Sequence, residues 1–299
     1  MIAGYRCLIL ELAVRRAEAI GINLFIGIAT VVALTVAFWC PSALAQQSTQ
    51  DLATAAQNPI AAMYSLPFQN NTYFGAGRNH NETANVLNIQ PVLPFTFGDL
   101  NIISRTIAPL IYLPGLATDT SDITSETPFS GSHFGLGDIN QSLFFSPANS
   151  EGLIWGVGPA FSLPTATATP LGSGKFSIGP TAVALVTPKP WVVGILARQL
   201  WSVAGPSDRS NVSQLLLQPF VNYNLPEGWY LASAPIITAN WNATSGNRWN
   251  FPLGGGVGKI LKIGDQPINV GLQGFDYVQS PSGGPRWTLR FQVQFLFPR

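Results

Sequence analysis

Side chains suited to acid–base or nucleophilic chemistry are scarce in this chain. It has two histidines, His80 and His133. A serine hydrolase needs a histidine and a nucleophilic serine whose side chains converge. Ser132 stands directly beside His133, and the side chains of adjacent residues in an extended segment point apart, so this pair does not meet the requirement. We therefore predict no catalytic residue and no enzyme activity, and two histidines are too few to indicate a metal site.

A glycine-rich segment has only a superficial likeness to a phosphate-binding loop. The run from Gly254 to Lys259 lacks the Walker spacing and the Ser or Thr that follows the lysine. Glycine within a strand more often marks a bend or a close approach of two backbones. The formal net charge is +1, which provides no basic face for nucleic acid. We predict no bound cofactor and no nucleic-acid partner.

The clearest structural pattern is the alternation of side-chain types over residues 286–297. One set of alternate positions is apolar and aromatic, namely Trp287, Leu289, Phe291, Val293, Phe295 and Phe297. The other set is polar and begins Arg286, Thr288, Arg290, Gln292 and Gln294. Successive side chains of a strand point to opposite sides, so this strand separates an apolar environment from a polar one.

The first 45 residues are typical of a targeting segment. Arg6, Arg15 and Arg16 form a positive region, an apolar stretch covers residues 20–39, and Ala43-Leu44-Ala45 matches a small-x-small cleavage site. We expect residues 1–45 to be a cleaved signal peptide; the alternative is a retained transmembrane anchor, since the apolar stretch is long enough to span a bilayer. Both cysteines lie in this segment, so the mature chain is expected to have no disulfide.

Composition after this segment favours a membrane protein built from strands. Charged residues make up 10% of the chain, against about 25% in ordinary globular proteins. No continuous apolar run follows residue 45, so no second transmembrane helix is expected. Lipid tolerates no unpaired backbone, which leaves a closed barrel as the main option. The soluble alternative is a β-sandwich with one wetted face.

Alternating segments and their connections predict an antiparallel, up-and-down transmembrane β-barrel of about twelve strands. The expected strands are 67–77, 86–96, 101–113, 134–145, 151–163, 175–187, 191–203, 211–223, 229–240, 249–262, 268–278 and 286–297. Short links alternate with longer polar ones, as in outer-membrane barrels. An even strand number places both chain ends in the periplasm. The predicted organisation is therefore a signal peptide (1–45), a periplasmic leader or short helix (46–66) and a barrel in the bacterial outer membrane (67–299).

Prolines inside the expected strands are awkward for any barrel, because each removes one donor from a ladder. We expect β-bulges or local breaks at these positions. They are Pro91, Pro109, Pro159, Pro180, Pro219 and Pro235.

Polar side chains of the expected strands are the candidate functional residues. A charge facing lipid near the midplane costs about 2–4 kcal/mol, so charges near mid-strand should face the lumen. The lumen-facing candidates are Arg198, Gln218, Asn222, Arg286, Arg290, Gln292 and Gln294. Arg105 and Lys259 share the parity of apolar neighbours, so the face assignment is doubtful at both. The candidates either guide a solute or form a network that merely fills the barrel.

Two segments resemble a known bacterial family. They are residues 58–71, which include Ser65-Leu66-Pro67-Phe68-Gln69-Asn70-Asn71, and the segment Asn88-Ile89-Gln90-Pro91-Val92. The family is labelled as putative outer-membrane proteins of the meta-pathway of phenol degradation; its members are often called transporters, and some are misnamed neuromedin U. The resemblance implies a Gram-negative outer-membrane barrel that passes aromatic or other hydrophobic compounds. It implies no functional residue that can be assigned here.

Two functional hypotheses follow. The first is a passive outer-membrane channel or transporter for small solutes, with aromatic and hydrophobic compounds among them, in which substitution of Arg198 or Arg290 changes selectivity. The second is a closed structural or adhesive barrel that binds a partner through the long loop 114–133. A lipid-modifying enzyme that uses His133 is the third alternative and the least supported. The expected partners are outer-membrane lipid, a small-molecule solute and the outer-membrane insertion machinery, which would bind the C-terminal strand.

Overall fold

The computed structural model describes residues 49–115, 131–150 and 152–298. The predicted signal peptide, residues 1–45, and most of the long loop 114–133 lie outside the described residues. A short helix, α3 (Thr49–Gln57), precedes the strands, and Pro59 follows shortly after its end. The helical alternative for the segment before the barrel is therefore the one that forms. None of the helices in the described part of the chain is long and apolar enough to cross a membrane.

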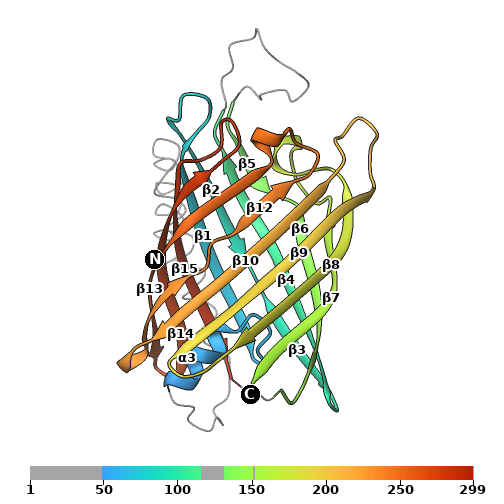
Figure 1. Ribbon diagram of the computed structural model, residues 1–299. Helices are drawn as coiled ribbons and strands as arrows, with labels where there is room; N and C mark the ends of the chain where they lie inside the picture. The colour runs from blue at the N-terminus through green and yellow to red at the C-terminus, as the bar shows by residue number, and fades with distance from the viewer. Residues whose placement is uncertain (1–48, 116–130, 151, 299) are drawn as a thin grey trace, which may run out of the picture. The chain divides into compact units, whose positions relative to one another are not determined.

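The remaining chain forms one sheet that closes on itself (Figure 1). Its strand segments are β1 (Tyr64–Ala76), β2 (Glu82–Ile89), β3 (Val92–Phe97), β4 (Leu100–Leu113), β5 (His133–Leu136), β6 (Ile139–Pro147), β7 (Leu153–Leu163), β8 (Phe176–Val186), β9 (Trp191–Ala204), β10 (Ser213–Asn224), β11 (Trp229–Ser233), β12 (Ile237–Asn240), β13 (Trp249–Ile263), β14 (Gln266–Gln279) and β15 (Trp287–Phe297). The pairs β2/β3, β5/β6 and β11/β12 each make one interrupted strand, which leaves twelve barrel strands as predicted. All pairings are antiparallel, and β15 closes the barrel against β1, with Tyr64 opposite Phe297.

Two of the three strand interruptions lie directly at prolines where breaks were predicted. Pro91 separates β2 from β3, and Pro235 separates β11 from β12. Two further prolines face an interruption in the neighbouring strand. Pro109 lies opposite the gap between β5 and β6, and Pro219 lies opposite the gap at Pro235. The prolines, which lack a backbone N–H donor, therefore coincide with the interruptions of the strands or lie opposite them.

The last two prolines leave their own strands continuous but open a gap in one ladder. The β6–β7 ladder passes from the pair Ser142–Ala160 to the pair Phe145–Val157, and so skips Pro159. The β8–β9 ladder likewise omits Pro180. These observations confirm the expectation of local breaks at the six prolines.

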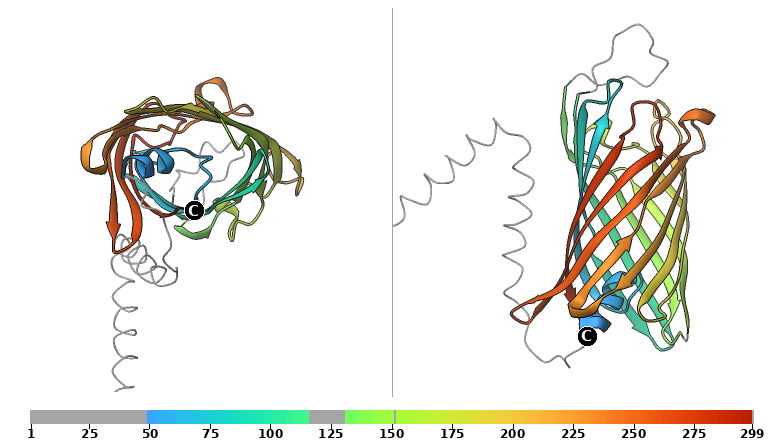
Figure 2. Two further views of the ribbon diagram at one scale, coloured as in Figure 1. Left: turned by 90° about the horizontal axis from the view of Figure 1, so that it is seen from below. Right: turned by 60° about the vertical axis from the view of Figure 1, so that its left-hand side comes forward.

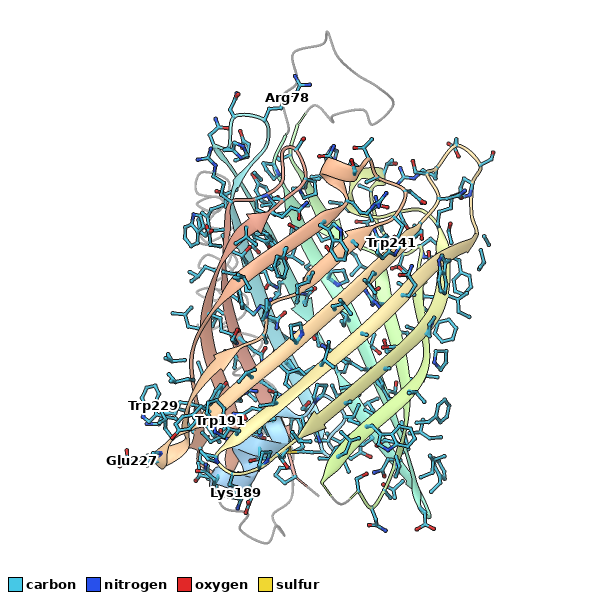
Figure 3. All side chains as sticks on the ribbon, viewed as in Figure 1. Arg78, Lys189, Trp191, Glu227, Trp229 and Trp241 are labelled. Carbon is cyan, nitrogen blue, oxygen red and sulfur yellow. The ribbon has the colours of Figure 1, made fainter. Side chains whose placement is uncertain are left out.

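The outer surface of the barrel is apolar. On three adjacent strands, Leu231, Val257 and Leu272 face each other in register and are 49, 45 and 46% exposed. Trp191 and Trp229 lie at the end of the barrel that holds α3, and Trp241 lies at the opposite end, where the longer loops are (Figure 3). This distribution matches an apolar band flanked by aromatic girdles, the surface that a bilayer requires.

Arg105 and Lys259, whose faces the sequence left undecided, lie on opposite faces of the barrel wall. Lys259 shares the outer face with Val257, but near the barrel end, where its ammonium lies 4.6 Å from the ring centroid of Trp229. Arg105 instead lines cavities inside the barrel, beside the interior residue Ile103. Sharing alternate positions with apolar residues therefore indicates the outer face correctly for Lys259. It indicates the wrong face for Arg105, because part of the barrel interior is itself apolar.

That apolar interior packs against the wall formed by β3 to β10. Four of its side chains are fully buried, namely Phe144, Ile103, Leu185 and Val192, and Phe220 is 5% exposed. Phe144 thus faces the interior, although aromatic side chains near strand ends are typical of the interfacial girdles of outer-membrane barrels. The interior therefore has a packed apolar side and a polar side, and the interior cavities are lined by residues of both.

Candidate functional site

Helix α3 lies inside one mouth of the barrel (Figure 2). Leu52 and Ala53 are 2 and 1% exposed and pack with Met63, Ile260 and Leu296. At its end, Gln57 Nε2 donates a hydrogen bond of 2.8 Å to Asn224 Oδ1 on β10. On the surface, Lys189 Nζ lies 3.4 Å from Asp51 Oδ1, an exposed pair that contributes little stability. The helix is held chiefly by its apolar face, which the Ala-rich sequence supplies.

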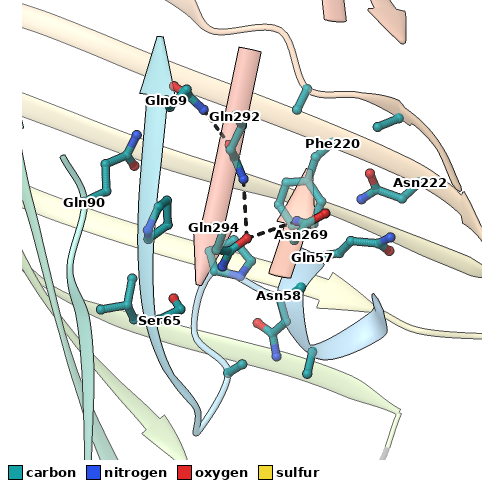
Figure 4. A pocket seen from close by; sticks show the side chains of 18 of the residues that line it. Gln57, Asn58, Ser65, Gln69, Gln90, Phe220, Asn222, Asn269, Gln292 and Gln294 are labelled. Atoms are coloured by element: carbon teal, nitrogen blue, oxygen red, sulfur yellow. Dashed lines mark hydrogen bonds between the residues drawn. The ribbon is translucent and has the colours of Figure 1, made fainter. Parts of the chain in front are cut away.

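A polar cavity of about 160 Å³ begins where α3 ends (Figure 4). Its wall on β15 and β1 is formed by Gln292 and Gln294, and by Gln69, whose Nε2 donates to Gln292 Oε1 at 3.0 Å. Gln294 accepts a bond of 3.1 Å from Asn269 Nδ2, and Asn269 Oδ1 accepts one of 2.7 Å from the Tyr230 hydroxyl. Amide side chains thus line this wall in an ordered chain.

A second cavity, of about 70 Å³, shares the side chains of Gln69, Gln90, Arg105 and Gln218 with the first. Arg105 Nη2 donates to Gln90 Oε1 at 2.8 Å. Arg198, from β9, also lines this cavity, and its Nη1 donates to Asn140 Oδ1 on β6 at 2.9 Å. Because β4 and β9 are separated around the sheet by β6, β7 and β8, these arginines approach one space from different parts of the wall.

Arg290 joins three parts of the interior. Its Nε donates to Asn71 Oδ1 at 3.0 Å, and its Nη1 donates to the Ala234 carbonyl at 2.7 Å. Ala234 lies in the break between β11 and β12, where no ladder partner accompanies it. The guanidinium also lies 4.6 Å from the ring centroid of Phe275. Arg290 therefore substitutes for a missing strand contact at the break caused by Pro235.

Replacement of Arg290 by methionine should destabilise the barrel, because a side chain of similar length would lose both hydrogen bonds. Hydrogen bonds to charged groups contribute about 1.5–3 kcal/mol each. We expect a loss of about 1.5–3 kcal/mol, below the sum for two bonds because methionine also removes the desolvation cost of the buried guanidinium. The measurement is urea unfolding of the refolded barrel in detergent micelles. The matched control is Arg286→Met, because Arg286 is exposed beside the longer loops. Equal stability of the two variants would contradict a bridging role for Arg290.

The predicted lumen-facing residues fall into two places. Arg198, Gln218, Asn222, Arg290, Gln292 and Gln294 line the two interior cavities. Arg286 precedes β15 and lies among the loops, beside a separate space of about 440 Å³. Alternation along the first expected strand could also have placed Gln69 and Asn71 among the lumen-facing candidates. It did not place Arg105 there, and nothing in the sequence around Tyr230 indicated that its side chain faces the interior.

The two histidines lie in different loop regions. His80 is exposed between β1 and β2, where its Nδ1 lies 2.8 Å from the Gly75 carbonyl, and His133 begins β5. Among the residues that the structure describes, no group of three or more His, Cys, Asp and Glu side chains could hold a metal ion.

Comparison with known proteins establishes the fold. No family model and no curated protein matches the sequence. The chain is similar to the crystal structure of an outer-membrane channel from Pseudomonas putida F1, with a TM-score of 0.58 and 14% identity over 85% of this chain and all (100%) of that chain. This chain has the fold of an outer-membrane β-barrel. Another similar structure is the NanC porin, with a TM-score of 0.49 and 11% identity over 78% of this chain and 100% of that chain. A third is the CymD monoaromatic hydrocarbon channel, with a TM-score of 0.45 and 10% identity over 87% of this chain and 95% of that chain.

Proposed function

We propose that the protein is a passive outer-membrane channel through which small solutes cross by way of the polar cavities. The observation that carries this proposal is the pair of cavities with a shared wall of Gln69, Gln90, Arg105 and Gln218. A wall of amide and guanidinium groups offers replaceable hydrogen bonds to a hydrated solute, whereas a barrel stabilised only by packing has no need of them. The similarity to a barrel described as an outer-membrane channel supports the same proposal.

In this proposal the polar residues of the inner wall have the role of guiding the solute. Arg198, Gln218, Asn222, Arg290, Gln292 and Gln294 line the route between α3 and the longer loops, and Arg286 lies at its outer entrance. The family resemblance adds aromatic compounds as the solute class. Residues 1–45 act as a cleaved signal peptide, and the C-terminal strand β15 is the segment that the insertion machinery binds.

A closed structural barrel is the second candidate. The observation that favours it is the filled half of the interior, where Phe144, Ile103 and Leu185 pack as in a globular core, together with α3 in one mouth. In that case the barrel stabilises the membrane or displays its loops to a partner, and no solute passes.

Conductance separates these two functions. Residues 46–299 would be refolded, checked for the shift in gel mobility on heating that folded barrels show, and inserted into planar bilayers at several salt concentrations. Stepwise openings whose size rises with salt concentration would support a water-filled route. A heat-modifiable barrel that inserts and yet stays silent would overturn the channel and leave the structural role.

A further inference from the structure

We propose that the smaller cavity binds the carboxylate of a small hydrophobic anion between Arg105 and Arg198. This inference rests on the proposed channel and names the class of solute that its narrow part selects. The two guanidinium groups line one space of about 70 Å³, which opens onto no carboxylate of the described residues. The anion would therefore be the counter-charge that the described part of the protein does not provide.

The charge balance of the interior is the first argument. Three arginines (Arg105, Arg198 and Arg290) and no aspartate or glutamate are found among the residues that line the two cavities. In the described ranges the ion pair between Lys189 and Asp51 lies on the surface, away from these cavities. The cavities therefore carry net positive charge, which attracts anions and repels cations.

The hydrogen bonds of the arginines provide the second argument. The partners of Arg105 and Arg198 are the neutral oxygens of Gln90 and Asn140, and each of these bonds uses a single guanidinium nitrogen. A guanidinium has five N–H donors in a planar fork that matches a carboxylate. The two guanidinium groups line one small cavity without a counter-charge. Their mutual repulsion is strong in a low dielectric, so this arrangement is unfavourable unless an anion binds between them.

The apolar side of the same cavity gives the solute its second property. Phe144, Leu196, Leu216 and Ile236 line it together with the arginines. A carboxylate held by the guanidiniums would thus have its hydrophobic body against these side chains. A protein cavity of about 150 Å³ is known to hold benzene. The smaller cavity has about 70 Å³, so the ring of a bound aromatic anion would extend past the shared wall into the adjoining cavity of about 160 Å³. Size and lining together fit a compact anion of the benzoate type better than a polymer or an inorganic ion.

The test compares three probes on the refolded barrel in planar bilayers. Benzoate tests the full interaction, benzamide removes the charge, and acetate removes the ring. We expect benzoate to block the current at concentrations at which benzamide and acetate do not. Arg105→Gln and Arg198→Gln should each weaken the benzoate block about tenfold or more, which corresponds to about 1.4 kcal/mol. The control Lys259→Gln, which removes a positive charge from the outer face of the barrel beside Trp229, should leave the block unchanged.

Selectivity gives an independent readout on the same variants. In a potassium chloride gradient the native channel should prefer chloride, and the double variant Arg105→Gln/Arg198→Gln should lose most of that preference. If a glutamine variant does not reach the heat-modifiable folded form, Arg105→Lys and Arg198→Lys replace it. These keep the charge but lose the fork, so the benzoate block should weaken while the chloride preference remains.

The outcomes distinguish this site from the channel itself. A conducting barrel that benzoate and benzamide block equally, or whose block is unaffected at both arginines, would overturn the anion site and leave the channel. A silent barrel would overturn the channel; calorimetric titration with benzoate in detergent would then decide the site. Heat of binding that disappears in Arg105→Gln and Arg198→Gln would support it, and the absence of heat from the native barrel would overturn it.

Discussion

Removal of α3 (Thr49–Gln57) should raise the single-channel conductance several-fold. The helix lies inside one mouth of the barrel and closes the lower side of the larger cavity with its last turn. It is held by a small apolar contact around Leu52 and Ala53 and by one side-chain hydrogen bond to Asn224. The twelve-stranded wall does not depend on it, because β1 begins after the helix and pairs fully with β15. The measurement is conductance of the refolded deletion variant in planar bilayers.

A reversible crosslink tests the same helix without removing it. Gln57 and Asn224 are in contact through the ends of their side chains, so in the refolded chain 46–299 the variant Gln57→Cys/Asn224→Cys should be joined by a short thiol-reactive crosslinker that contains a reducible disulfide. We expect low conductance when the two positions are crosslinked and higher conductance after reduction. The control Asp51→Asn removes the charge of the exposed pair with Lys189 and should change neither value. A deletion variant with native conductance would show that the helix is not part of the constriction.

Arginine in place of Val257 should destabilise the barrel by about 2–4 kcal/mol, the cost of this charge near the midplane of a bilayer. Val257 lies midway along β13 on the apolar outer face, between Leu231 and Leu272. Its cross-strand neighbours on that face are apolar, and Lys259, two residues along the same face, carries a like charge that would not offset the desolvation of a guanidinium. The measurement is urea unfolding of the barrel refolded into phospholipid vesicles.

The matched control uses the same strand and the same face. Ile263 ends β13 and is 66% exposed, so Ile263→Arg places the charge at the interface, where the cost falls to about 0–1 kcal/mol. Equal destabilisation by Val257→Arg and Ile263→Arg would contradict the depth assignment. No destabilisation by either variant would contradict a lipid-facing outer surface.

Most of the wall was predictable from local pattern, because a strand that separates lipid from an interior must alternate along its whole length. Residues 286–297 illustrate this, since the expected strand and β15 (Trp287–Phe297) nearly coincide. The prolines were equally informative. Loss of an N–H donor is a property of the residue itself, so Pro91 and Pro235 marked the breaks in the wall before any pairing was known.

The interior was predictable only in part. Gln292, Gln294 and Arg290 face inward as their alternation indicated, and they line the larger cavity. Arg105 was ambiguous because Ile103, on the same side of β4, is apolar. Alternation distinguishes the two faces of a strand by polarity, so it fails wherever the inner face is filled by a hydrophobic core.

The sequence by itself determined the class of the fold, the number of barrel strands and the positions of their breaks, because these depend on periodicity and on backbone chemistry within each segment. Only the tertiary structure decided that α3 enters the barrel mouth, that one side of the interior is packed, and that Arg105 and Arg198 line the same cavity. The physical reason is that β4 and β9 are far apart along the chain and are not paired in the sheet. Closure of the barrel brings their inward side chains together, and no local pattern records that meeting.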